Sequence, residues 1–188
     1  MKNIALFASG NGTNVQRIAE YFADKDVAIR LIVSNKSDAY VLERAKNLNI
    51  ETLLIDRNSF YQSDKIVQTL QQLQLDLIVL AGFLWLVPDN LINAFPEKII
   101  NIHPALLPKY GGKGMFGMHV HEAVVENKEP FSGITIHYVN QHYDEGNIIM
   151  QQKCELSPDD TPEDVAKKIH ALEYEYFPLA IEKLLFGS

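Results

Sequence analysis

The sequence predicts a doubly wound α/β fold, with a mostly parallel sheet, helices on both of its faces and an antiparallel element in the last third. Short apolar stretches of strand length alternate with stretches whose apolar residues recur every three or four positions, as in helices. The strand-like stretches are apolar at almost every position, which is typical of parallel strands buried on both faces. Beyond residue 130 the pattern changes to a two-residue alternation, which favours antiparallel pairing.

The first part of the chain contains the parallel part of the expected sheet. Its strands are expected at residues 3–9, 27–34, 51–55, 77–81 and 98–102. The helices between them are expected at residues 14–23, after an N-cap at Ser37, at residues 64–74 and after Pro88. A serine hydroxyl accepts a hydrogen bond from the first helical turn, and proline suits the first helical position because its missing N–H has no partner there. Right-handed crossovers then make these strands parallel.

Two strands are expected in the last third, at Ser132–Val139 and Asn147–Glu155. The acidic turn Asp144-Glu145-Gly146 joins them. They form either a hairpin or an antiparallel edge of the main sheet.

One long helix is expected to follow these strands. It opens at Thr161-Pro162, with Asp164 at the capping-box position. Its expected inward stripe consists of Val165, Ile169, Leu172, Tyr176, Ala180 and Leu184. Pro178 is expected to kink or interrupt the helix, because proline cannot donate the helical hydrogen bond.

Length and composition restrict the class of protein. With 188 residues, 47% hydrophobic and 22% charged, the chain is expected to form one domain over residues 1–188. The net charge of -7 argues against nonspecific nucleic-acid binding, which needs a basic surface. No apolar stretch is long enough for a membrane span, and the apolar start is too short for a signal peptide, so we expect a cytoplasmic protein. The single cysteine, Cys154, excludes a disulfide framework and a Cys-based metal site.

A glycine loop lies between the first expected strand and the first helix. Its residues are Ser9, Gly10, Asn11, Gly12, Thr13 and Asn14. Glycines let a backbone approach a ligand and the free amides of a helix N-terminus bind anions, although a tight turn alone explains the same glycines. Position 15 is valine where the dinucleotide fingerprint needs glycine, and the Gly-Lys-Ser/Thr of a P-loop is missing. A monophosphate is therefore the favoured ligand.

The end of the fifth expected strand carries Asn101 and His103. Residues two apart in a strand point to the same face, and ligands of doubly wound folds bind at the carboxyl ends of the strands. A carboxamide and an imidazole on one face can donate hydrogen bonds to one developing oxyanion. We therefore expect both side chains to carry chemistry, although a polar strand end that caps a loop has the same pattern.

Other candidates lie farther along the chain. Asp144 belongs to an acidic turn and matters only if the fold returns it to the end of the fifth strand. Glu173 lies at the edge of the inward stripe, where a carboxylate binds a ligand or forms a rim salt bridge. The apolar loop Ala81–Pro88 suits a flat aromatic ligand or is simply buried. His119 and His121 have the spacing of metal ligands but no evident third ligand, so no metal is expected.

Several of these segments together resemble the folate-dependent formyltransferase family. They are Ser9–Asn14, Ala81-Gly82-Phe83, Asn101-Ile102-His103-Pro104-Ala105-Leu106-Leu107-Pro108 and Asp144-Glu145-Gly146. The resemblance covers nearly the whole chain, and its most specific part is the Asn-x-His-Pro-x-Leu-Leu-Pro block. It implies a Rossmann-like formyltransferase domain that uses 10-formyltetrahydrofolate as co-substrate and no metal. The acceptor that it implies is glycinamide ribonucleotide of de novo purine biosynthesis, and we expect a monomer or weak homodimer.

The resemblance also implies roles for individual residues. The implied catalytic residues are Asn101, His103 and Asp144. The implied ribonucleotide-binding residues are Gly10, Asn11, Gly12, Thr13 and Asn14 for the phosphate and Glu173 for the ribose hydroxyls. The implied folate-binding residues are Leu84, Trp85, Leu86, Val87, Val139, Asn140, Gln141, His142 and Tyr143.

In this scheme the carboxylate of Asp144 lies beside His103. It is expected to raise the pKa of the imidazole and so to favour the charged form that meets the oxyanion. The segment Gly111–Gly117 is longer than the usual family linker, and its glycines predict a mobile flap near the site. Trp85 stands where the family often has a basic residue, and His170 where glutamine is common.

Four other functions share parts of this pattern. A methionyl-tRNA formyltransferase is expected to need a further C-terminal domain and a basic surface, and a formyltetrahydrofolate hydrolase a further N-terminal domain. A noncatalytic phosphometabolite-binding module has no use for Asn101 and His103. A dehydrogenase is disfavoured because the dinucleotide fingerprint fails at Val15.

Overall fold

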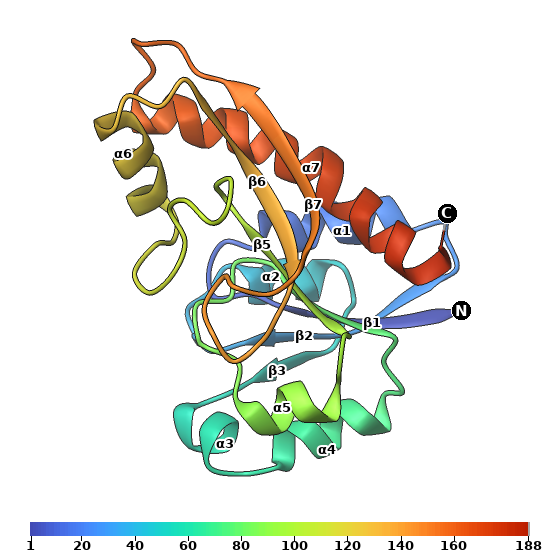
Figure 1. The fold of residues 1–188 in the computed structure, drawn as a ribbon. Helices are drawn as coiled ribbons and strands as arrows, with labels where there is room; N and C mark the ends of the chain where they lie inside the picture. The colour runs from blue at the N-terminus through green and yellow to red at the C-terminus, as the bar shows by residue number, and fades with distance from the viewer. Residues whose placement is uncertain (188) are drawn as a thin grey trace.

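The computed structural model describes residues 1–187, which form seven strands and seven helices (Figure 1). The strands are β1 (Lys2–Phe7), β2 (Val27–Ser34), β3 (Thr52–Leu54), β4 (Leu77–Leu80), β5 (Ile99–His103), β6 (Phe131–Tyr138) and β7 (Ile148–Glu155). The helices are α1 (Thr13–Phe22), α2 (Val41–Asn47), α3 (Arg57–Tyr61), α4 (Lys65–Gln72), α5 (Asp89–Ala94), α6 (Met118–Glu126) and α7 (Pro162–Phe186).

All seven strands belong to one sheet in the order β3-β2-β1-β4-β5-β6-β7. The strands from β3 to β5 are parallel, whereas β6 pairs antiparallel with β5 and β7 antiparallel with β6. The expected antiparallel element is therefore confirmed as both a hairpin and an extension of the main sheet. The strand order reverses between β1 and β4, where the two following loops diverge and leave a crevice at the carboxyl edge.

Helices cover both faces of the sheet, as predicted (Figure 1). Helices α1, α2, α6 and α7 bury their apolar residues in one core, which Ile4 and Leu6 of β1 enter from the sheet. Helices α3, α4 and α5 form a second core with the alternate residues Ala5 and Phe7. Because both faces of β1 are covered, its residues from Ile4 to Phe7 are fully buried, which explains why the strand is apolar at successive positions.

The structure differs from the sequence prediction mostly at element ends and in short helices. Ser37 does not cap α2, whose N-cap is Tyr40. The chain after β2 first makes a turn in which the Ala39 N–H donates to the Lys36 carbonyl (3.3 Å), and this delays the helix. The short helices α3 and α6 lie in segments for which no helix is predicted. Pro88 is the N-cap of α5 rather than its first residue.

Helix α7 begins with the expected capping box, in which the Thr161 side chain accepts from the N–H of Asp164. The helix runs without interruption through the buried Pro178, so the predicted break is wrong. Its buried face is also broader than predicted. Helix α7 packs against α1, α6, β6 and β7, so the burial extends beyond the expected stripe. The additional fully or nearly fully buried positions are Ala166, Glu173, Phe177, Pro178, Ile181 and Leu185, while Leu172, Tyr176 and Leu184 are only partly buried.

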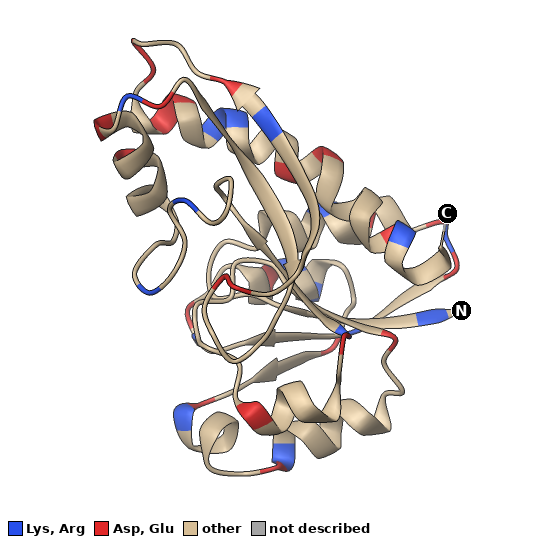
Figure 2. Cartoon of the chain, viewed as in Figure 1, with Lys and Arg blue, Asp and Glu red and all other residues tan. Residues whose placement is uncertain are grey.

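Basic and acidic residues are interspersed over the helices on both faces of the sheet (Figure 2). Within residues 1–187, no helix has the combination of length and hydropathy needed to cross a bilayer.

Candidate functional site

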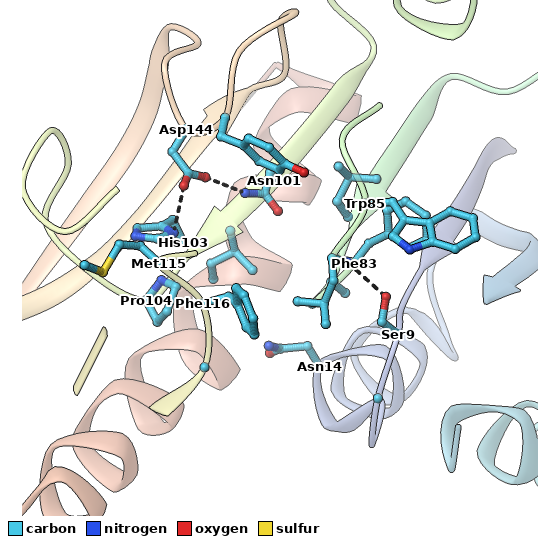
Figure 3. A pocket seen from close by; sticks show the side chains of 18 of the residues that line it. Ser9, Asn14, Phe83, Trp85, Asn101, His103, Pro104, Met115, Phe116 and Asp144 are labelled. Carbon is cyan, nitrogen blue, oxygen red and sulfur yellow. Dashed lines mark hydrogen bonds and ion pairs between the residues drawn. The ribbon is translucent and has the colours of Figure 1, made fainter. Parts of the chain in front are cut away.

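A cavity of about 720 Å³ lies at the carboxyl edge of the sheet (Figure 3). Its walls come from the loops that follow β1, β4 and β5, together with residues 112–117, the turn before β7 and helices α6 and α7. This is the place where the strand order reverses, so the cavity occupies the crevice that the topology creates. The volume is in the range of small-molecule sites.

The glycine loop forms one end of the cavity and leads into α1. Gly12 is the N-cap of α1 with a φ of +77°, and a Cβ at this position would lie 2.5 Å from the side chain of Val41. The loop thus needs glycine for its backbone conformation and for its contact with α2. Arg44 of α2 donates to the Asn11 carbonyl at 2.8 Å and to Asn11 Oδ1 at 2.6 Å, which fixes the loop from outside. The first amides of α1 have no helical acceptor and are available to an anion.

The hydroxyl of Ser9 connects three loops at this edge. It donates to Asn35 Oδ1 at 2.6 Å and accepts from the backbone N–H of Leu84 at 2.9 Å. The Ser9 N–H also donates to the carbonyl of Gly82 at 2.9 Å. The glycine loop and the apolar loop after β4 are therefore held at a fixed separation across the crevice.

Asn101 and His103 both face the cavity from the end of β5, as the two-residue spacing predicts. The carboxylate of Asp144 reaches them from the turn before β7: Oδ1 accepts from Asn101 Nδ2 at 3.5 Å and Oδ2 lies 3.4 Å from His103 Nδ1. His137, which pairs with Asn101 across β5 and β6, completes the group. Its Nε2 lies 3.1 Å from Asn101 Nδ2 and 3.6 Å from Asp144 Oδ1.

The hydrogen bonds of His103 define which ring nitrogen faces the reaction. Nε2 lies 2.7 Å from the carbonyl of Tyr110, and because a carbonyl only accepts, Nε2 carries a proton and donates. Protonation of His103 therefore takes place at Nδ1, beside Asp144. Burial lowers the pKa of His103 below its ordinary value of 6.5, although the Asp144 charge and the Tyr110 carbonyl both act to raise it. The expectation of a raised pKa is thus wrong in its net direction, because the desolvation of the nearly buried ring outweighs the nearby charge.

Asp144 is held as a carboxylate by its donors. Burial alone would raise its pKa, but the neighbouring imidazoles of His137 and His103 and the backbone N–H of Gly112 together lower the pKa below its ordinary value of 3.8. The Gly112 N–H donates to Oδ2 at 3.0 Å. Asp144 also adopts a left-handed φ of +57°, an uncommon conformation for a residue other than glycine.

Glu173 lies on the buried face of α7 and borders the cavity, with 7% of its surface exposed. Its Oε2 accepts from Asn14 Nδ2 at 3.0 Å, which links α7 to the glycine loop. Burial raises the pKa of Glu173 from 4.5 to about 7, and the bond from Asn14 only partly opposes this. Within residues 1–187 no basic side chain forms an ion pair with Glu173, so the alternative of a rim salt bridge is wrong.

The apolar loop after β4 forms the other end of the cavity. Phe83 and Trp85 pack against the second core, where Phe60 contacts both rings, and the guanidinium of Arg57 lies 5.1 Å from the Trp85 ring. The predicted folate residues that line the cavity are Leu84, Trp85, Leu86, Val87, Val139, His142 and Tyr143. Asn140 and Gln141 belong to the same turn but are outside the cavity lining.

The cavity also has a group of lining residues that the sequence reasoning did not propose as ligand contacts. They include Lys36, Met115, Phe116 and His121. The glycines around Met115 and Phe116 were a usable signal, since they predict a flap at this place. His121 is buried, its Nδ1 has no hydrogen-bond partner, and burial lowers its pKa to about 4. Within residues 1–187, no group of three His, Cys, Asp or Glu side chains is placed to hold a metal ion.

Several known proteins are similar to this chain in sequence and fold. A family model described as formyl transferase matches residues 2–181. A relative from Haemophilus influenzae named phosphoribosylglycinamide formyltransferase is 37% identical over 97% of this chain and 86% of its own length. The crystal structure of glycinamide ribonucleotide transformylase 1 from Geobacillus kaustophilus is similar with a TM-score of 0.89 and 33% identity, and covers 98% of this chain and 99% of that one.

A plant relative is longer than this chain. The chloroplastic phosphoribosylglycinamide formyltransferase of Arabidopsis thaliana is 40% identical over 94% of this chain, which spans only 63% of that protein.

Proposed function

Because this chain belongs to the formyl transferase family, we propose that it transfers a formyl group from 10-formyltetrahydrofolate to the amine of glycinamide ribonucleotide, a step of de novo purine biosynthesis. The observation that carries the proposal is the convergence of Asn101, His103 and Asp144 in the wall of one cavity. One end of that cavity suits a phosphate and the other a flat aromatic group. The choice of glycinamide ribonucleotide as the acceptor follows the names of the relatives.

The ribonucleotide is proposed to bind between the glycine loop and α7. Its phosphate meets the amides at the start of α1, where backbone N–H groups and the helix dipole favour an anion. Its ribose hydroxyls donate to Glu173, which has a carboxylate at the cavity wall and, among residues 1–187, only Asn14 as a hydrogen-bond partner. This places the amine toward the end of β5.

The folate is proposed to bind at the opposite end, between the loop Leu84–Val87 and the turn Val139–Tyr143. The residues present fit a pterin, because the wall around Phe83 and Trp85 is apolar and aromatic and the neighbouring backbone offers polar groups along it. The formyl group then lies beside Asn101 and His103.

The proposed reaction is an acyl transfer. The amine nitrogen attacks the formyl carbon, and the carbonyl oxygen becomes an oxyanion that accepts a hydrogen bond from Asn101 Nδ2. The bond between the formyl carbon and N10 then breaks. The nucleophile loses one proton and N10 gains one, so the products are the N-formyl ribonucleotide and tetrahydrofolate.

The acid and base of this reaction are proposed to be His103 with Asp144. The lowered pKa of His103 leaves Nδ1 unprotonated at neutral pH, so that it accepts the proton of the attacking amine. The imidazolium that forms is stabilised by the carboxylate 3.4 Å away and then protonates N10. Asp144 thus acts on the charged form that exists only during turnover, although burial keeps the resting imidazole neutral.

The proposal is tested by mixing the protein with a 10-formylfolate donor and following deformylation by absorbance. Glycinamide ribonucleotide should support rapid deformylation, whereas glycinamide without the phosphoribosyl group and water should not. Equal rates with all three acceptors would instead indicate a hydrolase. Binding of the ribonucleotide with no deformylation would indicate a binding module and contradict the proposal.

Residues 1–188 are proposed to act as one formyltransferase domain, in the cytoplasm, as a monomer or weak homodimer. A size measurement by light scattering at low and high protein concentration tests the last point.

A further inference from the structure

The segment Gly111–Gly117, which we call the glycine strap, crosses the cavity between β5 and α6. Residues 112–117 all line the cavity. Gly112, Gly114 and Gly117 have φ values of +93°, +86° and +55°, which side chains other than glycine rarely adopt. The Met115 N–H donates to the Gly112 carbonyl at 3.1 Å, so the strap is a defined turn.

The strap is fixed at its start to the catalytic group. The Gly112 N–H donates to Asp144 Oδ2 at 3.0 Å. A Cβ at Gly111 would lie 2.5 Å from Leu107 Cδ2 and 3.4 Å from Asp144 Cβ, so the backbone here is packed closely against both residues. The strap therefore begins in direct contact with the turn that carries Asp144.

Phe116 is the large apolar side chain that this arrangement presents to the cavity. It lines the cavity and yet has 45% of its surface exposed. Its ring stacks on the imidazole of His119 with centroids 5.3 Å apart and an interplanar angle of 20°, so the ring is already oriented. An ordered aromatic ring that faces an open cavity gains apolar contact when a ligand covers it.

The position of Phe116 indicates which of the two proposed substrates its ring contacts. Figure 3 draws its ring between Pro104, which follows His103, and Asn14, which belongs to the glycine loop. This is the path from the proposed phosphate site to the reacting centre. Figure 3 draws Phe83 and Trp85 farther to the right, beside Ser9 at the start of the glycine loop.

We propose that Phe116 is a ribonucleotide-binding residue, whose ring covers the ribose and glycinamide of the acceptor and excludes water from the formyl carbon. The inference rests on the proposed function, because it assumes that the acceptor extends from the glycine loop to His103. It assigns to the strap a role in acceptor affinity and in the choice between amine and water as nucleophile.

The test compares the variants Phe116→Ala and Phe116→Leu with wild type. Phe186→Ala is the matched control, because Phe186 also is 45% exposed but lies at the end of α7, outside the cavity lining. For each protein, the KM of glycinamide ribonucleotide, the KM of the 10-formyl donor and the ratio of formyl transferred to formyl hydrolysed are measured. Thermal melting reports whether each variant is folded.

Phe116→Ala should raise the KM of the ribonucleotide about tenfold, equivalent to about 1.4 kcal/mol, and leave the KM of the donor within about twofold. It should also increase the hydrolysed share of the donor. Phe116→Leu, which retains apolar area, should lie between Ala and wild type, and the control should equal wild type.

Any of four outcomes overturns the inference. An unchanged ribonucleotide KM with an unchanged transfer-to-hydrolysis ratio shows that the ring does not touch the acceptor. Equal increases in both KM values, or a lower melting temperature with unchanged KM values, show a structural role. A wild-type protein that does not use the ribonucleotide refutes the proposed function first, before any variant is compared.

Discussion

Replacing Glu173 by glutamine is expected to stabilise the fold above pH 7 and at the same time to weaken ribonucleotide binding. Glu173 is almost completely buried, and its pKa is raised from 4.5 to about 7 by that burial. A carboxyl group whose pKa is higher in the folded state binds its proton more tightly there than in the unfolded chain. Its favourable contribution to folding is therefore complete below about pH 4.5 and is lost as the pH rises through 7.

The size of this effect follows from the two pKa values. A change from 4.5 to about 7, at 1.36 kcal/mol per pKa unit, corresponds to about 3 kcal/mol of folding free energy. Glutamine has the same shape, carries no charge at any pH and keeps an oxygen that can accept from Asn14. The free energy of unfolding of Glu173→Gln should thus exceed that of wild type by less than about 1 kcal/mol at pH 5 and by up to about 3 kcal/mol at pH 8.

The assay is urea unfolding of both proteins at pH 5, 6, 7 and 8, with ribonucleotide binding measured in parallel at pH 8. The variant should bind the ribonucleotide more weakly, because an amide replaces one carboxylate oxygen as an acceptor for the ribose hydroxyls. A 2′,3′-dideoxyribose analogue should bind both proteins equally. A stability difference that does not change with pH would refute the electrostatic reasoning, and an equal loss for the analogue would make Glu173 only structural.

Other substitutions test the remaining parts of the site. Gly12→Ala forces a side chain into a φ of +77° and to within 2.5 Å of Val41. The KM of the ribonucleotide should therefore rise about tenfold or more, while the KM of the donor should stay within about twofold. Equal increases in both KM values would contradict a phosphate role for the loop. Asp144→Asn should lower kcat by about 10²–10³ with little change in binding. It should also move the NMR titration of His103 to still lower pH, because the nearest opposite charge is removed; an unchanged titration with near wild-type turnover would exclude Asp144 from the mechanism. Arg44→Met removes two hydrogen bonds to the glycine loop, so inorganic phosphate should inhibit several-fold less, and Arg44→Lys should restore little because a single ammonium cannot replace the guanidinium fork. Unchanged phosphate inhibition in Arg44→Met would show that the loop keeps its shape without this support.

The local features of this protein could be predicted from the sequence because they depend on short-range spacing. Asn101 and His103 share a face since they are two residues apart in one strand. The capping box at Thr161 and the glycine at position 12 follow from backbone requirements that a few residues define. The alternation of strand and helix patterns likewise predicts a sheet that is covered by helices on both faces.

The features that could not be predicted depend on long-range packing and on opposing energies. Asp144 reaches His103 only because β6 returns antiparallel beside β5, which no residue spacing reveals. Helix α7 buries Glu173 because it packs against two helices and two strands, which widens the buried face beyond a single stripe. The direction of the His103 pKa shift depends on the balance between burial of the ring and the charge of Asp144, and only the three-dimensional structure shows both.

Each of the two cores on either side of the sheet supports the proposed site of a different substrate. The glycine loop and Glu173 are attached to helices of the first core, whereas Phe83 and Trp85 pack into the second. Changes in α1, α6 or α7 can therefore reshape acceptor recognition while the packing beneath the one-carbon donor stays the same. An exchange of loops in the first layer must still keep the hydrogen bonds of Ser9 to Gly82 and Leu84, because they join the glycine loop to the loop that carries Phe83 and Trp85.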